Sequence, residues 1–130
     1  MKRQAGFTIL EVLVGFLVAA LLLSVILSAF SDGMRSFVQA DRLSQASLVA
    51  QSRLAELGHS APLQPGNYQG RDAAGYSWQV AIAPLSWSFE SELQGHQRIL
   101  YQVNVKVSWQ GAAGRESSYE ISSMRLAQLL

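Results

Sequence analysis

Residues 7–30 read FTILEVLVGFLVAALLLSVILSAF, a mostly apolar run of 24 residues in which Glu11 is the only charged side chain. About 20 apolar residues are enough for a helix to cross a bilayer, so the run predicts a membrane helix. A carboxylate without a partner inside such a helix costs about 3 kcal/mol. We therefore expect Glu11 to meet a positive charge.

The residues before this run offer a source for that charge. Two cations, Lys2 and Arg3, and a glycine, Gly6, precede the first aromatic residue, Phe7. A cut between Gly6 and Phe7 would create an α-amine four residues before Glu11, and residues four apart lie on one face of a helix. An α-amine has a pKa of about 8 and is mostly cationic at neutral pH. Such a cut would thus supply an amine that can pair with Glu11.

The stretch from Gly6 to Val12, GFTILEV, resembles the class III signal of type IV pilins and type II secretion pseudopilins. That signal consists of a short basic leader, Gly, an aromatic residue, Thr, two aliphatic residues and Glu. The resemblance implies that a membrane prepilin peptidase cuts after Gly6 and methylates the amine of Phe7. It also implies that Glu11 pairs with the amine of a neighbouring subunit during assembly.

Two simpler interpretations of this region compete with the resemblance. An ordinary secretory signal has an apolar core of 7–15 residues followed by a small-residue cleavage site. Val18-Ala19-Ala20 is an acceptable site, but the run of 24 residues is too long for such a core. A plain signal anchor explains the hydrophobicity and gives no reason for Glu11 or Gly6.

Length and charge complete the predicted organisation. Of the 130 residues, we expect 1–6 to be a leader peptide, 7–30 a transmembrane and helix-packing segment, and 31–130 a periplasmic domain. The leader cations place the N-terminus in the cytoplasm and the C-terminal domain across the membrane. For a bacterial chain this means a single pass through the inner membrane with the domain in the periplasm. Without Lys2 and Arg3, the chain has eight basic and nine acidic residues, so it carries no excess of positive charge that would attract nucleic acid. The chain has no cysteine, so the domain would fold without disulfides.

The membrane segment continues into an amphipathic helix. No proline interrupts residues 7–57, and apolar residues recur every three or four positions after Phe30. We predict one helix from Phe7 to Leu57, stopped by Gly58. These recurring apolar residues form a stripe along the helix, which could pack on the chain's own sheet or on neighbouring chains. The residues expected at a helix packing interface are Phe37, Leu43, Ala50, Leu54 and Leu57.

Beyond the helix the apolar period changes to two, which predicts strands. We expect a short strand from Gly66, a second around Trp78 to Ile82 ended by Pro84, a third over 99–109, and a fourth over 118–126 with Tyr119 and Ile121 facing inward. The last two are joined by turn residues 110–114 and should form an antiparallel hairpin, whereas 84–97 should be a loop. The fold class is therefore α+β and pilin-like, one long N-terminal helix followed by a small antiparallel sheet.

The sequence shows no arrangement of residues for catalysis. His59 and His96 stand alone without ligand-spaced partners, so we expect no metal and no cofactor. Glu90 and Glu92 lie in a polar loop, where solvation explains them better than acid–base chemistry. Trp87, with Phe89 close by, could form a contact patch for a partner or a cap on the sheet edge. We predict that the protein is not an enzyme.

The end of the helix resembles that of one particular class within the pilin-like superfamily. Residues 48–57, LVAQSRLAEL, resemble the helix end of I-class minor pseudopilins of type II secretion, although Ser52 replaces an expected Asn. The resemblance implies a subunit that nucleates and caps the pseudopilus tip to drive protein export across the outer membrane. It implies as partners the J-class and K-class minor pseudopilins, the major pseudopilin, the inner-membrane assembly platform and the prepilin peptidase. A minor pilin of a type IV pilus is the alternative, and a membrane-anchored periplasmic enzyme is a third interpretation.

Overall fold

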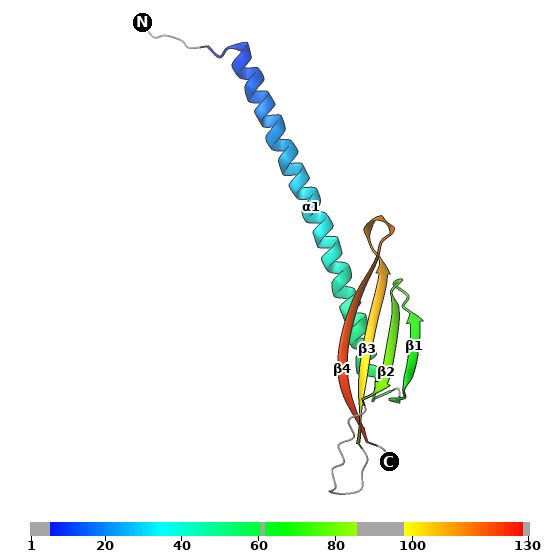
Figure 1. Ribbon diagram of the computed structural model, residues 1–130. Helices are drawn as coiled ribbons and strands as arrows, with labels where there is room; N and C mark the ends of the chain where they lie inside the picture. Colours follow the sequence, from blue (N-terminus) through cyan, green and yellow to red (C-terminus); the bar gives the residue numbers. More distant parts are fainter. Residues whose placement is uncertain (1–5, 61, 86–97, 129–130) are drawn as a thin grey trace. The chain divides into compact units, whose positions relative to one another are not determined.

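The computed structural model describes residues 6–60, 62–85 and 98–128. Within these ranges the elements, in chain order, are α1 (Ile9–Glu56), β1 (Gly66–Arg71), β2 (Ser77–Pro84), β3 (Arg98–Gln110), the 3-10 turn η1 (Ala112–Gly114) and β4 (Glu116–Gln128) (Figure 1). A long first helix followed by an antiparallel sheet is the predicted α+β, pilin-like fold, and the prediction is confirmed.

The chain divides into two compact units, residues 1–40 and residues 41–130, and α1 contributes to both. The described part of the first unit is helical from Ile9, and its large apolar side chains are exposed. By length and composition α1 is able to cross a membrane. An exposed apolar surface of this extent needs lipid or another protein to cover it.

Both ends of α1 are fixed by local interactions. Thr8 precedes the helix as its N-cap, because its Oγ1 accepts a hydrogen bond from the backbone N–H of Glu11 at 3.2 Å. At the other end Gly58 adopts φ +88°, and the N–H groups of His59 and Ser60 bond the Glu56 carbonyl. The helix is therefore shorter than the predicted Phe7–Leu57 by two residues at its start and one at its end.

The sheet has the strand order β1-β2-β3-β4, so every strand pairs with its sequence neighbour, and all pairs are antiparallel. The β3–β4 hairpin confirms the predicted one, with Val105 opposite Ile121 and a register that continues through Gln110 opposite Glu116. Tyr119 is half-buried on the same side of β4 as Ile121, as expected. The predicted loop 84–97 differs at its start, since Pro84 is the last residue of β2; residues 86–97 lie outside the described ranges.

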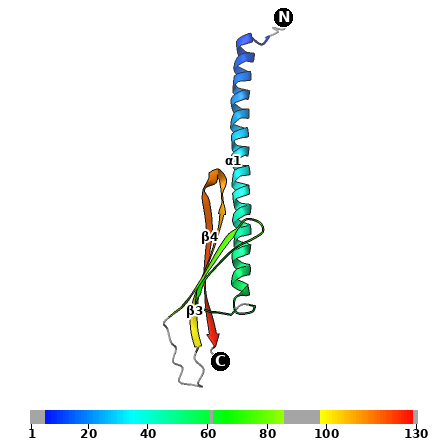
Figure 2. The same ribbon diagram turned by 90° about the vertical axis from the view of Figure 1, so that its right-hand side faces the viewer.

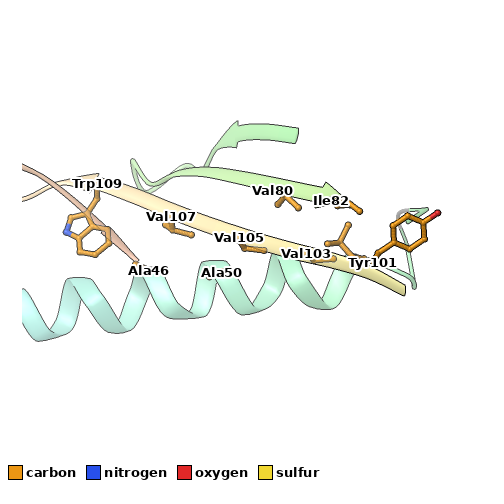
Figure 3. Close-up of a cluster of buried hydrophobic side chains, with 10 residues drawn as sticks. Ala46, Ala50, Val80, Ile82, Tyr101, Val103, Val105, Val107 and Trp109 are labelled. Atoms are coloured by element: carbon orange, nitrogen blue, oxygen red, sulfur yellow. The ribbon is translucent and has the colours of Figure 1, made fainter. Parts of the chain in front are cut away.

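The hydrophobic core lies between the sheet and the part of α1 after Ala40. In this unit the helix and the sheet form two layers (Figure 2). Ala46 and Ala50 are fully buried and face three fully buried valines on β3, namely Val103, Val105 and Val107 (Figure 3). Alanine on the helix leaves space for the valines, so the helix and sheet pack closely.

Polar contacts hold this helical segment at both ends of the sheet. At one end, Arg42 Nη1 donates to the Gln110 carbonyl at 2.7 Å, and the Tyr76 hydroxyl lies 3.4 Å from the Arg42 carbonyl. At the other end, Arg125 Nη2 on β4 donates to the Leu54 carbonyl at 3.2 Å. A cation at a helix C-terminus also compensates the negative end of the helix dipole.

Candidate functional site

The predicted cleavage site lies before the helix. Gly6, Phe7 and Thr8 are not helical, and the Phe7 side chain is 82% exposed. Exposed chain ends without regular structure are the segments that proteases reach most readily. The Gly6–Phe7 bond is therefore presented in a form that a peptidase can bind without unwinding α1.

The chain's own fold does not require a glycine at position 6. A Cβ built on Gly6 meets no atom of the described chain within 4 Å, and Gly6 does not adopt a positive φ. Gly58 contrasts with it, because its left-handed backbone favours glycine. The described fold therefore gives no reason for a glycine at this position, as it gives none for Gly15 or Gly33.

Thr8 and Glu11 occupy the two positions of a capping box. In this motif a Thr at the N-cap bonds the N–H of the N3 residue, and the N3 Glu can bond the N-cap N–H in return. The structure shows the first of these bonds, from Glu11 N–H to Thr8 Oγ1. Sequence analysis missed the role of Thr8, although the Thr-x-x-Glu spacing at the helix start was a signal for it.

The Glu11 carboxylate is exposed in the first turn of α1. Among the described residues it makes no ion pair and accepts no side-chain hydrogen bond. The positive end of the helix dipole favours a carboxylate in this turn, but contributes less than 1 kcal/mol at exposed sites. Within a membrane that contribution would not offset the cost of the charge, so a cationic partner is still needed.

The five residues expected at a packing interface differ in burial. Ala50 and Leu57 belong to the hydrophobic core, and Leu54 is half-buried against it. Phe37 and Leu43 are 70% and 45% exposed. The second half of the stripe therefore packs on the chain's own sheet, and the contacts of all five residues with other chains stay predictions.

The described structure brings no group of metal-ligating side chains together around the residues considered for catalysis or binding. Within residues 6–60, 62–85 and 98–128, no three His, Cys, Asp or Glu side chains come together as a metal site would require. His59 is exposed in the turn after α1. The other candidates, Trp87, Phe89, Glu90, Glu92 and His96, lie outside the described ranges.

Comparisons with known proteins identify the N-terminal site. Residues 1–27 match the family model described as the prokaryotic N-terminal methylation motif. The chain is also 39% identical over 85 residues to type II secretion system protein I of Xanthomonas campestris pv. campestris. That alignment covers 65% of this chain and 62% of the relative, so the chain spans a little less than two thirds of that protein. No solved structure matches the chain.

The described fold is pilin-like, and the N-terminal segment matches a methylation motif. Together, the motif and the relative support a minor pseudopilin of the I class from a type II secretion system, in agreement with the resemblance found in the sequence. They also support a protein anchored in the inner membrane through its apolar N-terminal helix.

Proposed function

We propose that the protein is a structural subunit that nucleates and caps the tip of a type II secretion pseudopilus, and so drives protein export across the outer membrane. In this proposal it has no enzymatic activity of its own. Its partners are the J-class and K-class minor pseudopilins, the major pseudopilin, the inner-membrane assembly platform and the prepilin peptidase. The similarity to a type II secretion protein favours this role over that of a minor pilin in a type IV pilus.

The observation that carries the proposal is the arrangement around the start of α1. Gly6 is a glycine that the fold does not need, it precedes an exposed non-helical bond, and Glu11 follows one turn later without a partner among the described residues. Removal of residues 1–6 would satisfy all three features, since the new Phe7 amine of a neighbouring subunit supplies the cation for Glu11. The domain after the membrane segment, residues 31–130, would then lie in the periplasm.

The exposed part of the helical stripe supports lateral assembly. Phe37 and Leu43 are large apolar side chains that stay exposed in the described structure. In the proposed filament they contact the helices of neighbouring subunits, while Ala50, Leu54 and Leu57 hold the subunit's own sheet in place.

The assembly role of Glu11 is tested by Glu11→Gln, which keeps the shape and removes the charge. We expect normal processing and at least a ten-fold fall in the secreted fraction of an exported enzyme, measured in culture supernatants. Glu120→Gln is the matched control, because Glu120 is an exposed carboxylate on β4, and it should secrete normally. Normal secretion by the Glu11 variant would refute the role proposed for this charge. Loss of surface pili with normal secretion would instead favour the type IV pilus.

The cleavage step is tested by Gly6→Val. We expect the full precursor to accumulate, whereas the unaltered protein should begin at Phe7 and be heavier by one methyl group, as read by mass spectrometry. Mature protein beginning at Phe7 in the Gly6→Val variant would contradict the proposed cut. Because a Cβ at position 6 meets no atom of the described residues within 4 Å, the substitution should leave the fold intact.

A further inference from the structure

The start of α1 has a fixed place relative to the Gly6–Phe7 bond. Ile9 is the first helical residue, so only Phe7 and Thr8 lie between the helix and that bond. The described chain before Ile9 does not continue along the helix axis but leaves it sideways (Figure 1, Figure 2). The segment that a peptidase must bind is therefore short and directly joined to a regular helix.

The backbone carbonyls of this segment differ in their hydrogen bonds. The Thr8 carbonyl accepts bonds from the N–H groups of Glu11 and Val12, at 3.1 Å and 3.2 Å. Among the described residues, no backbone N–H group donates to the carbonyl of Gly6 or Phe7. Hydrolysis of the Gly6–Phe7 bond must attack the Gly6 carbonyl. That carbonyl therefore stands outside the hydrogen-bond ladder of α1.

The Thr8 side chain keeps the helix from starting earlier. Its Oγ1 accepts a bond from the Glu11 N–H at 3.2 Å. An N-cap side chain makes this bond while its own backbone stays outside the helix. Thr8 is also β-branched, and β-branched residues are weak helix formers. Capping and intrinsic propensity thus both favour a helix that begins at Ile9.

Gly6 is a second residue of this segment at which the helix could begin. Glycine is accepted at N-cap positions, and the carbonyl of an N-cap residue accepts the first bond of its helix. A helix capped at Gly6 would thus engage the Gly6 carbonyl with the N–H of Leu10. Without the Thr8 cap some molecules would take this start, and in others the first turn would open, because helix ends open at little cost. Both changes lower the fraction of molecules that present the Gly6–Phe7 bond as the structure shows it.

We propose that Thr8 is a positioning residue for the cleavage. Its hydroxyl holds the start of α1 at Ile9 and so keeps the Gly6 carbonyl outside the helix, where a peptidase can bind it as exposed chain without regular structure. Thr8 acts through the conformation of its own chain and touches no reacting atom. This inference rests on the proposed function for the cut after Gly6, and it adds a residue that determines specificity by capping a helix.

Cleavage kinetics of the full precursor by purified prepilin peptidase in detergent test this role. A substrate that presents its bond in only a fraction of its molecules binds more weakly by that fraction. Loss of the cap shifts the helix-start equilibrium about five-fold, so Thr8→Val should raise the KM about two- to five-fold. The kcat should change less than two-fold, because the bound substrate already has the productive conformation. A fall in kcat with an unchanged KM would overturn the proposal, since it would indicate a direct contact with the reacting groups.

A series of substitutions at position 8 separates capping from shape. Valine has the shape of threonine without the hydrogen-bond acceptor, whereas asparagine has a different shape and is a strong N-cap. We expect Thr8→Ser and Thr8→Asn to keep the KM within two-fold of the unaltered chain, and Thr8→Ala to raise it as Thr8→Val does. Ser28→Ala is the matched control with normal kinetics, because it removes a hydroxyl that bonds the Ser24 carbonyl within the same helix. A normal KM for Thr8→Val, or equal defects for Thr8→Asn and Thr8→Val, would refute the capping role.

Failure of this inference and failure of the proposed function are distinguishable. If the unaltered precursor is cut after Gly6 while Thr8→Val has a normal KM, the capping role fails and the proposed cut stands. If the product of the unaltered precursor does not begin at Phe7, the proposed cut itself fails, whatever the KM of the variants. The kinetics do not depend on secretion, so the assembly role of Glu11 is tested apart from both.

Discussion

Gly70→Ala should destabilise the folded domain because it forces Trp78 out of its place. The new Cβ would lie 2.4 Å and 2.7 Å from two ring atoms of Trp78, whereas carbon atoms in contact prefer about 3.5–4.0 Å. The indole ring must therefore move by about 1 Å. Overpacking of this kind costs about 1–3 kcal/mol. The Arg53 guanidinium stacks on the Trp78 ring, with Cζ 4.7 Å from its centroid, and loss of this contact adds about 0.5–1 kcal/mol.

We expect a total loss of about 1.5–4 kcal/mol in the free energy of unfolding. The unit from Asp41 to Leu130 has 90 residues, and for a domain of that size the Tm should fall by about 6–30 °C. The measurement is thermal unfolding of the full-length protein in detergent, followed by the near-ultraviolet circular dichroism of its tryptophans. Gln69→Ala, at the exposed neighbouring position on β1, is the control and should leave the Tm within a few degrees.

A double-mutant cycle isolates the cause. In a Trp78→Leu background the clash is absent, and Gly70→Ala should then be neutral or slightly stabilising because alanine lowers the entropy of the unfolded chain. An equal penalty in both backgrounds would refute the steric explanation. A Tm unchanged by Gly70→Ala alone would show that the ring has free space to move.

Three further substitutions probe the packing and the helix ends. Val105→Ala removes two buried methyl groups from the centre of the core and should cost about 2–3 kcal/mol, measured by chemical denaturation. Ala50→Leu should cost about 1–3 kcal/mol by overpacking the helix–sheet contact, whereas Leu48→Ala at an exposed position should change stability by less than about 0.5 kcal/mol. Thr8→Ala should remove about 1 kcal/mol of helix capping. We expect amide hydrogen exchange in the first turn of α1 to become roughly five-fold faster. Thr8→Ser is the control, because it keeps the hydroxyl.

Much of the fold follows from local sequence patterns. The absence of proline and the recurring apolar positions predicted α1, and the alternation over 99–109 predicted β3 with its buried valines. Gly58 marked the end of the helix because the residue after a helix often adopts a left-handed conformation, which glycine reaches without a steric penalty from a Cβ. These signals lie within a few residues of the structure they specify, so they can be read from one sequence.

Contacts between distant residues were not predictable in the same way. Nothing near Arg125 indicates that it bonds a helix carbonyl 71 residues earlier in the chain. The pairing of Gly70 with Trp78 depends on the β1–β2 register, which the alternation of apolar residues fixes only once the turn is known. A pocket lined by Arg53, Pro62, Tyr68 and Trp78 was likewise missed, because its walls come from four segments that meet only in the folded chain.

The cleavage site, in contrast, was predicted from the sequence, and the structure alone would not have indicated it. Gly6, Phe7 and Glu11 were identified by the resemblance to a known signal, and a helix with exposed apolar side chains would not by itself have distinguished that signal from a plain anchor. The structure contributes the free space around Gly6 and the capping role of Thr8. Neither feature can be derived from the spacing of charges alone.

The strand order of the sheet has a consequence for how the chain folds. Because β1, β2, β3 and β4 pair in the order in which they are synthesised, each strand pairs with its neighbour in the chain and the search for register stays local. Loop closure entropy rises with loop length, and chains rich in local contacts fold fast. The docking of α1 joins segments farther apart in sequence, as Arg125 and Leu54 show. We therefore expect the sheet to form one hairpin at a time and the helix to dock on it last.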